Sequence, residues 1–134
     1  MSSAGYSGTP LVKKLGIKPG DRAAWLAAPE HFEALLGDHG ADVKTSLRGG
    51  ADVVVCFVTE RRELARRVDA LKRAIAPDGM AWIAWPKRSS GVVTDMTEDV
   101  VRDVALPTGL VDVKVCAIDE TWSGLKLVIR TALR

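Results

Sequence analysis

Side chains that could bind a charged small molecule lie in two short segments far apart in the chain. They are Lys87, Arg88, Asp119, Glu120, Trp122 and Ser123. Two cations, two carboxylates and an indole ring could together hold a small anionic or zwitterionic molecule, with Trp122 stacking against it. The alternative is structural, and it is the preferred interpretation. Exposed ion pairs and aromatic rings that cover turns are common, so the same set would simply pin a hairpin turn.

Glu30 adds one more carboxylate after an earlier apolar run, and the remaining reactive side chains predict little chemistry. His31 and His39 have no cysteine or carboxylate partner at the spacing of metal ligands, so no metal site is predicted. Cys56 and Cys116 fall inside apolar runs rather than beside cations at helix starts. We therefore expect small buried thiols, and predict neither a nucleophile nor a disulfide.

The elements that position these side chains are organised around residues 78–87. A glycine turn leads into an apolar run that stops at Pro86, as in a buried strand, with Trp82 and Trp85 expected on opposite faces. An amphipathic helix before it is indicated by apolar residues at helical spacing: Leu64, Val68, Leu71 and Ile75. Residues 51–58 are almost continuously apolar, which is typical of a strand buried on both faces of a parallel sheet.

Shorter segments complete an alternation of strands and helices. Helices are expected at residues 10–15, 28–36, 60–75 and 98–105, with Thr9, Thr59 and Thr97 as N-caps at three of them. Further strands are expected at residues 22–27, 42–47, 111–117 and 125–130, and a loop at residues 88–93. The link between the last two strands is too short for a crossover helix, so they should form an antiparallel hairpin.

This order predicts an α/β fold: a three-layer, Rossmann-like, mostly parallel sheet with a C-terminal antiparallel hairpin. We expect a single domain over residues 1–134, with residues 1–8 flexible. Ligands of open parallel sheets bind beyond the carboxyl ends of the strands. That rim would carry residues 28–31, 59–60 and 87–88, which include Glu30 and Lys87. The turn at residues 119–123 should join it, because it follows a strand that runs in the same direction as the central one.

The layout resembles a shortened class I methyltransferase fold. Residues 18–22, which lead into a strand, and residues 71–79, which lead into Met80, look like that family's connections. The resemblance implies a glycine-rich cofactor turn after the first strand and an acidic residue after the second. Here residues 27–31 contain no glycine, and residues 47–50 offer Arg48 instead of an acid.

These departures, together with one missing strand–helix unit, lead us to predict bulk in place of the cofactor. We expect no binding of S-adenosylmethionine and no other cofactor.

Several strings also resemble a bacterial family of small proteins of unknown function. They are residues 5–11, 85–87, 97–101 and 119–125, and they span the whole chain. That resemblance implies no activity.

The composition and net charge of the chain limit the classes of partner that can be expected. Of 134 residues, 47% are hydrophobic and 27% charged, as in globular proteins, and the net charge of +2 gives no reason to expect nucleic acid as a partner. The sequence shows no apolar run of membrane length and no signal peptide, so a cytoplasmic location without membrane partners is expected.

Three functional hypotheses follow. The leading one is a non-catalytic module that binds a partner protein or a small anionic ligand, without a working S-adenosylmethionine site. The alternative is a small transferase-like enzyme that uses the rim of Lys87, Asp119 and Glu120. The third is a homodimer, or larger homo-oligomer, that pairs through the outer hairpin edge at residues 111–118.

Overall fold

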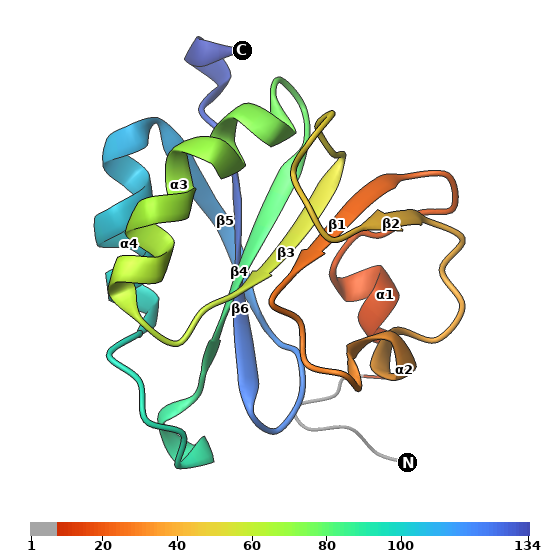
Figure 1. Ribbon diagram of the computed structural model, residues 1–134, viewed down its shortest axis with the longest axis vertical. Helices are drawn as coiled ribbons and strands as arrows, with labels where there is room; N and C mark the ends of the chain where they lie inside the picture. The colour runs from red at the N-terminus through yellow and green to blue at the C-terminus, as the bar shows by residue number, and fades with distance from the viewer. Residues whose placement is uncertain (1–7) are drawn as a thin grey trace.

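The computed structural model describes residues 8–134 and shows a six-stranded sheet with helices on both faces (Figure 1). The helices are α1 (Leu11–Lys14), α2 (Phe32–Leu36), α3 (Arg61–Ile75) and α4 (Glu98–Ala105). The strands are β1 (Arg22–Leu26), β2 (Asp42–Lys44), β3 (Val53–Phe57), β4 (Met80–Pro86), β5 (Leu110–Ala117) and β6 (Trp122–Ile129). The flexibility expected for residues 1–8 falls, for residues 1–7, outside the described residues.

The sheet has the strand order β2-β1-β3-β4-β6-β5. Strands β1 to β4 are parallel to one another, and β6 runs antiparallel to both β4 and β5. The predicted fold class, a mostly parallel sheet that ends in an antiparallel hairpin, is therefore confirmed. Strand β3 follows β2 without an intervening helix and lies on the other side of β1, which agrees with the missing strand–helix unit.

Alternation along β4 separates two apolar cores. Trp82 is fully buried on the face covered by α1 and α2, where its indole Nε1 donates to the carbonyl of Leu15 at 2.9 Å. Ile83 and Trp85 face α3 and α4 instead. The two tryptophans therefore point to opposite faces of the sheet, as their spacing predicts.

Three helices begin within a residue of the prediction, but α2 begins at Phe32, four residues after the predicted start at residue 28. Thr97 caps α4 as expected, because its Oγ1 accepts the backbone N–H of Val100 at 3.1 Å. Helix α1 begins after Pro10 instead of at it, and α3 begins after Glu60 instead of after Thr59. A short 3-10 helix, η1 (Arg88–Ser90), occupies part of the expected loop.

Two other elements matter for the site. Strand β2 covers only the first half of the predicted range, because it is an edge strand whose following residues, Thr45 and Ser46, are exposed. Strand β5 runs in the direction of β4, so the turn from β5 to β6 lies at the carboxyl ends of the parallel strands, as expected.

Within residues 8–134, no helix has the length and apolar character needed to cross a membrane.

Candidate functional site

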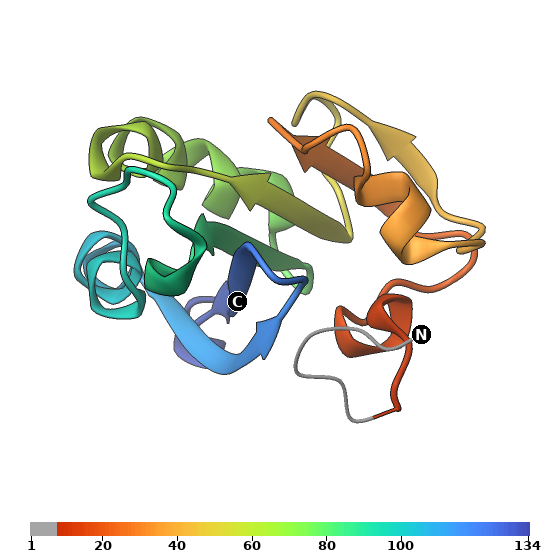
Figure 2. The same ribbon diagram turned by 90° about the horizontal axis from the view of Figure 1, so that it is seen from below.

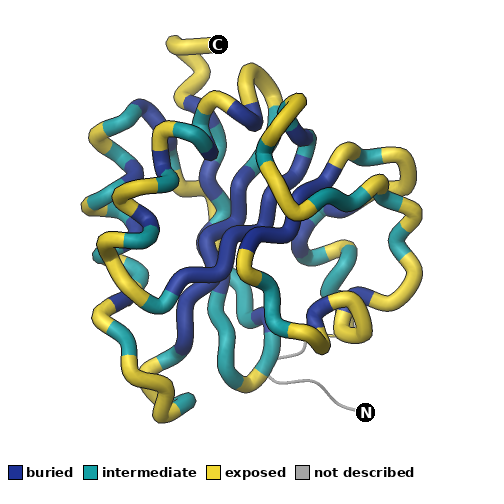
Figure 3. The backbone as a smooth tube through the Cα atoms, in the orientation of Figure 1, coloured by how far each residue is buried: buried dark blue, intermediate teal, exposed yellow. Residues whose placement is uncertain are grey.

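Four segments meet at the carboxyl edge of the sheet, seen from below in Figure 2. They are the turn after β1 at residues 27–31, the junction of β3 and α3 at residues 58–61, the segment after β4 at residues 87–90, and the hairpin turn at residues 118–121. We call this edge the rim. Figure 3 shows its turns as exposed or half-buried backbone below the buried strands. A ligand can therefore reach the rim without any strand moving.

Lys87 and Asp119 lie together at the rim, as predicted, but Lys87 contacts the backbone carbonyl of Asp119 and not its carboxylate. The Lys87 ammonium donates to the carbonyl oxygen of Asp119 at 2.7 Å, and the Lys87 backbone N–H donates to the carbonyl of Thr121 at 2.7 Å. The carboxylate of Asp119 takes other partners. The interpretation that these residues pin a hairpin turn is thus correct for Lys87, which fastens the turn to the end of β4.

The Asp119 carboxylate both closes the hairpin turn and binds a histidine. Its Oδ1 accepts the backbone N–H groups of Thr121 and Trp122, each at 2.8 Å, and its Oδ2 lies 2.9 Å from Nε2 of His31. Burial acts to raise the pKa of this carboxyl, but the hydrogen bonds from His31 and the two backbone donors outweigh it and lower the pKa. Asp119 is therefore ionised at neutral pH.

The pairing of His31 with Asp119 is what the sequence analysis missed: it placed both turns at one rim but weighed His31 itself only as a metal ligand. The two residues are 88 positions apart, so no local pattern could have revealed the hydrogen bond between them. An ionised carboxylate can only accept, so Nε2 of His31 must carry the proton that it shares with Asp119. Nδ1 is then the basic nitrogen, on a side chain that is 53% exposed. A histidine oriented by a carboxylate is an arrangement suited to accepting a proton.

The other predicted site residues are distributed unevenly around the rim. The ring of Trp122 packs edge-on against that of Phe57, with 5.0 Å between centroids, so this ring is partly committed to the core. Glu30 and Glu120 are exposed, and neither carboxylate bonds to another part of residues 8–134. They remain candidates by position only.

A cleft of about 470 Å³ opens beyond the end of β4, and we call it the β4 cleft. Lys87, Arg88 and Ser123 line one side and residues 94–98 the other, with Trp85 among the lining side chains. Three of the predicted site residues, Lys87, Arg88 and Ser123, therefore share one cavity. Asp119, Glu120 and Glu30 do not line it.

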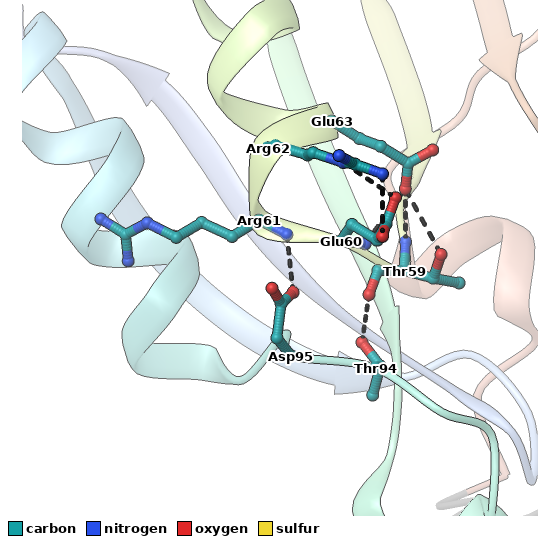
Figure 4. A network of polar contacts seen from close by, with 7 residues as sticks. All are labelled: Thr59, Glu60, Arg61, Arg62, Glu63, Thr94 and Asp95. Atoms are coloured by element: carbon teal, nitrogen blue, oxygen red, sulfur yellow. Dashed lines mark hydrogen bonds and ion pairs between the residues drawn. The ribbon is translucent and has the colours of Figure 1, made fainter.

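Hydrogen bonds fix the far wall of the β4 cleft to helix α3 (Figure 4). The Thr94 hydroxyl donates to the carbonyl of Thr59 at 2.5 Å, and Oδ1 of Asp95 accepts the backbone N–H of Arg61 at 2.7 Å. Glu63 closes the same network, because its Oε1 accepts the N–H groups of Thr59 and Glu60 at 3.0 Å each. The bond from Thr59 holds the pKa of Glu63 below its usual value. The wall is thus preformed.

The turn after β1 lies at the protein surface, and the bulk predicted for residues 27–31 stays a prediction. Ala27, Glu30 and His31 are exposed, and Ala28 and Pro29 are half-buried. Ala27 has a φ of +55°, the left-handed conformation that glycine usually supplies at a sharp turn. The backbone therefore makes the tight turn without glycine.

The two cysteines are free thiols with raised pKa values. Cys56 is fully buried, and desolvation raises its pKa to about 11, so it is a thiol and not a nucleophile. Cys116 is half-buried, with its pKa also raised by burial. In the part of the chain that the structure describes, no cluster of three or more His, Cys, Asp or Glu side chains could hold a metal ion.

Comparison with solved structures shows the same fold in methyltransferases. A SAM-dependent methyltransferase from Aquifex aeolicus superposes with a TM-score of 0.68 at 14% identity, covering 89% of this chain and 87% of that one. Magnesium protoporphyrin IX methyltransferase from Synechocystis, with bound SAM, gives 0.56 at 11% identity over 90% of this chain and 74% of that one. The N-methyltransferase NodS from Bradyrhizobium japonicum gives 0.54 at 14% identity over 90% and 92%.

No family model matches the sequence, and no curated protein matches it either. The resemblance to a bacterial family of unknown function thus has no support from these comparisons.

The structural neighbours also contradict the leading functional hypothesis, the non-catalytic module without a working S-adenosylmethionine site. The finding against it is the fold itself, which the SAM-dependent methyltransferase from Aquifex aeolicus shares over 89% of this chain. The methyltransferase-like fold of this chain favours the transferase-like alternative.

Proposed function

We propose that the protein is a small transferase that moves a methyl group from S-adenosylmethionine to a small acceptor at the rim. The observation that carries the proposal is the left-handed turn at Ala27 on a methyltransferase-like sheet, next to a histidine oriented by Asp119. Fold similarity at 14% identity supports the class of reaction and leaves the acceptor to be argued from this chain's own residues.

The residues at the ends of β1 and β2 fit the cofactor in part. Because β1 and β2 are parallel neighbours, the turn at Ala27 and the exposed hydroxyls of Thr45 and Ser46 lie at the same edge of the sheet. The turn and these hydroxyls would hold the cofactor, with no carboxylate at residues 45–50 to bind a ribose. The bound cofactor supplies a methyl group on a positively charged sulfur.

His31 acts as the base in this proposal. A hydroxyl or amino acceptor must lose a proton when it gains a methyl group, and Nδ1 of His31 can take it. Asp119 is a positioning residue: it fixes the tautomer and stabilises the imidazolium ion that forms. Lys87 keeps Asp119 in place by holding its carbonyl oxygen.

Isothermal titration calorimetry with S-adenosylmethionine tests the cofactor site. We expect binding to one site in the wild type and competition by S-adenosylhomocysteine. Ala27→Val should weaken binding, because a β-branched residue resists the left-handed conformation. Ala65→Val is the matched control, since Ala65 is exposed on α3 away from the turn. A wild type that gives no heat and no rise in melting temperature at millimolar ligand would refute the proposal.

The role of His31 is tested by substitution and rescue. His31→Gln should lower the release of S-adenosylhomocysteine, with a panel of hydroxylated and aminated carboxylic acids as acceptors, by about 100-fold. Added imidazole should restore part of the rate, because it replaces the missing base. Activity that survives His31→Gln unchanged would show that another group takes the proton.

A further inference from the structure

The polar side chains around the β4 cleft divide into committed acids and uncommitted donors. Asp95 uses its carboxylate to cap the N-terminus of α3 through the backbone of Arg61, and Glu98 forms an ion pair with Arg102. Both acids that line the cleft therefore already have a donor of their own. They contribute little free negative charge to a ligand in the cleft.

The opposite wall of the β4 cleft carries donors with no acid partner. Arg88 is exposed and forms no ion pair or hydrogen bond through its guanidinium with any part of residues 8–134. Lys87 uses one of its three ammonium protons on the carbonyl of Asp119, which leaves two. The Ser123 hydroxyl is also uncommitted among the described residues. The unsatisfied hydrogen-bonding capacity of this wall is thus mainly that of donors, and two of them are cationic.

The same cleft has an apolar part. Trp85, Val92 and Met96 are among its lining residues; Trp85 is 6% exposed and Met96 3%, so each presents a small apolar area, and Val92 is 43% exposed. A ligand that satisfied only the two cations would leave this area in contact with water. One with a flat apolar body and an anionic end matches both parts.

We propose that the β4 cleft binds a small organic carboxylate, with the carboxylate at Lys87 and Arg88 and the apolar body toward Trp85 and Met96. The claim that this carboxylate is the methyl acceptor rests on the transferase function proposed above. The claim that the cleft binds a carboxylate rests only on the side chains that line the cleft. Arg88 determines specificity in this proposal, because its planar guanidinium can hold both oxygens of a carboxylate.

Titration of the 15N-labelled protein with benzoate tests this site, without any cofactor present. We expect the backbone amide signals of Arg88, Val92 and Ser123 to shift together and to saturate at millimolar concentration. Benzamide has the same ring without the charge, and inorganic phosphate has charge without the ring. Both should bind at least about tenfold more weakly than benzoate, because each satisfies only half of the cleft.

Two variants with the same loss of charge separate the local effect from the general one. Arg88→Gln should weaken benzoate binding about tenfold, because it removes a charge-assisted hydrogen bond. Arg130→Gln removes an exposed arginine at the opposite edge of the sheet and should leave binding unchanged. The melting temperature of both variants should match the wild type, since neither guanidinium bonds to the described residues.

Equal affinities for benzoate and benzamide, equal effects of the two variants, or shifts confined to another surface would each overturn the carboxylate site. If phosphate bound as tightly as benzoate, the proposed contact of the apolar body with Trp85 and Met96 would be refuted. Failure of the protein to bind S-adenosylmethionine would refute the transferase function alone, because the benzoate titration contains no cofactor.

Discussion

Ala27 shows how one residue can keep the geometry of a glycine turn. Its φ of +55° lies in the left-handed region, where a side chain costs about 1 kcal/mol relative to glycine. The fold tolerates this cost because a methyl group is the smallest side chain and because Ala27 is exposed, with no packing to disturb. A sequence pattern that requires glycine therefore misjudges the turn.

The positive φ of Ala27 predicts how substitutions at this residue change the free energy of unfolding. Ala27→Val should lower the free energy of unfolding by about 1–2 kcal/mol, because a β-branched side chain adds strain at positive φ. Ala27→Gly should change it by less than about 0.5 kcal/mol, since relief of strain offsets the greater freedom of the unfolded chain. Urea denaturation measures both. A valine variant as stable as the glycine variant would show that the turn relaxes out of the left-handed region.

At the scale of elements, the connection from α3 to β4 limits how the central strand enters the sheet. A Cβ at Gly79 would lie 2.8 Å from the carbonyl oxygen of Ile75 and 2.9 Å from that of Ala51. Both atoms belong to the backbone of neighbouring elements, α3 and the approach to β3, so neither can turn aside. This close approach, and not conformational freedom, requires glycine here.

Gly79→Ala should therefore cost about 3 kcal/mol of unfolding free energy, because the backbone itself must shift. Gly91→Ala is the control: it has a φ of +79° and open space around the added methyl, so it should cost only about 1 kcal/mol. Thermal and urea unfolding of the two variants give the comparison. Equal losses would mean that the α3–β4 connection is more adaptable than its contacts indicate.

Helix α4 borders the β4 cleft and depends on its N-cap. Thr97→Ala should lower the free energy of unfolding by about 1 kcal/mol, since it removes the acceptor for the Val100 N–H. Thr97→Ser keeps the hydroxyl and should stay within about 0.5 kcal/mol of the wild type. Urea denaturation curves measure the free energy of unfolding of both variants. A serine variant as unstable as the alanine variant would show that the loss comes from the missing methyl group and not from the hydroxyl.

At the scale of the whole molecule, the rim joins distant parts of the chain through ionised carboxylates. Asp119 ties the hairpin turn to the segment before α2, and Glu63 orders the start of α3 next to the 94–95 segment. The pKa of each is lowered in the folded state, as is that of Asp52, whose main cause is the backbone N–H of Arg22. Their contribution to stability is therefore linked to pH.

The sign of this linkage predicts acid destabilisation. A carboxyl whose pKa is lower in the folded state contributes fully above its unfolded value of about 4, and the contribution is lost as pH falls through the folded value. The free energy of unfolding should thus fall between about pH 5 and about pH 3. Asp119→Asn should show a smaller fall in urea titrations at each pH. A stability that does not change over this interval would contradict the linkage.

The exposed edge at strand β5 could pair with a second copy of the chain. Strand β5 is the edge strand, Val113 and Val115 are 51% and 44% exposed, and homodimer formation through this edge stays a prediction. Lys114 and the irregular register between Asp112 and Lys114 weaken strand pairing, so we expect dimers only at high concentration. Light scattering should show the mass rising from 14.4 kDa in the wild type but not in Val115→Lys. A wild type that stays at one chain would exclude this edge.

The sequence by itself determined the order of elements and the class of fold. The apolar run at residues 51–58, the helical spacing from Leu64 to Ile75 and the short link before Trp122 each depend on local periodicity or chain length, which neighbouring residues fix. These features also placed Lys87 and the turn at Asp119 on one rim, because strand direction alone decides which edge a connection occupies.

Only the tertiary structure decided what that rim can do. The pairing of His31 with Asp119, the left-handed backbone at Ala27 and the hydrogen bond from Arg61 to Asp95 at the start of α3 each join residues far apart in the chain or depend on backbone angles. Such contacts arise from the packing of whole elements, and residue types at fixed spacing do not contain that information. For this reason the sequence predicted the scaffold correctly but did not reveal the pairing of His31 with Asp119.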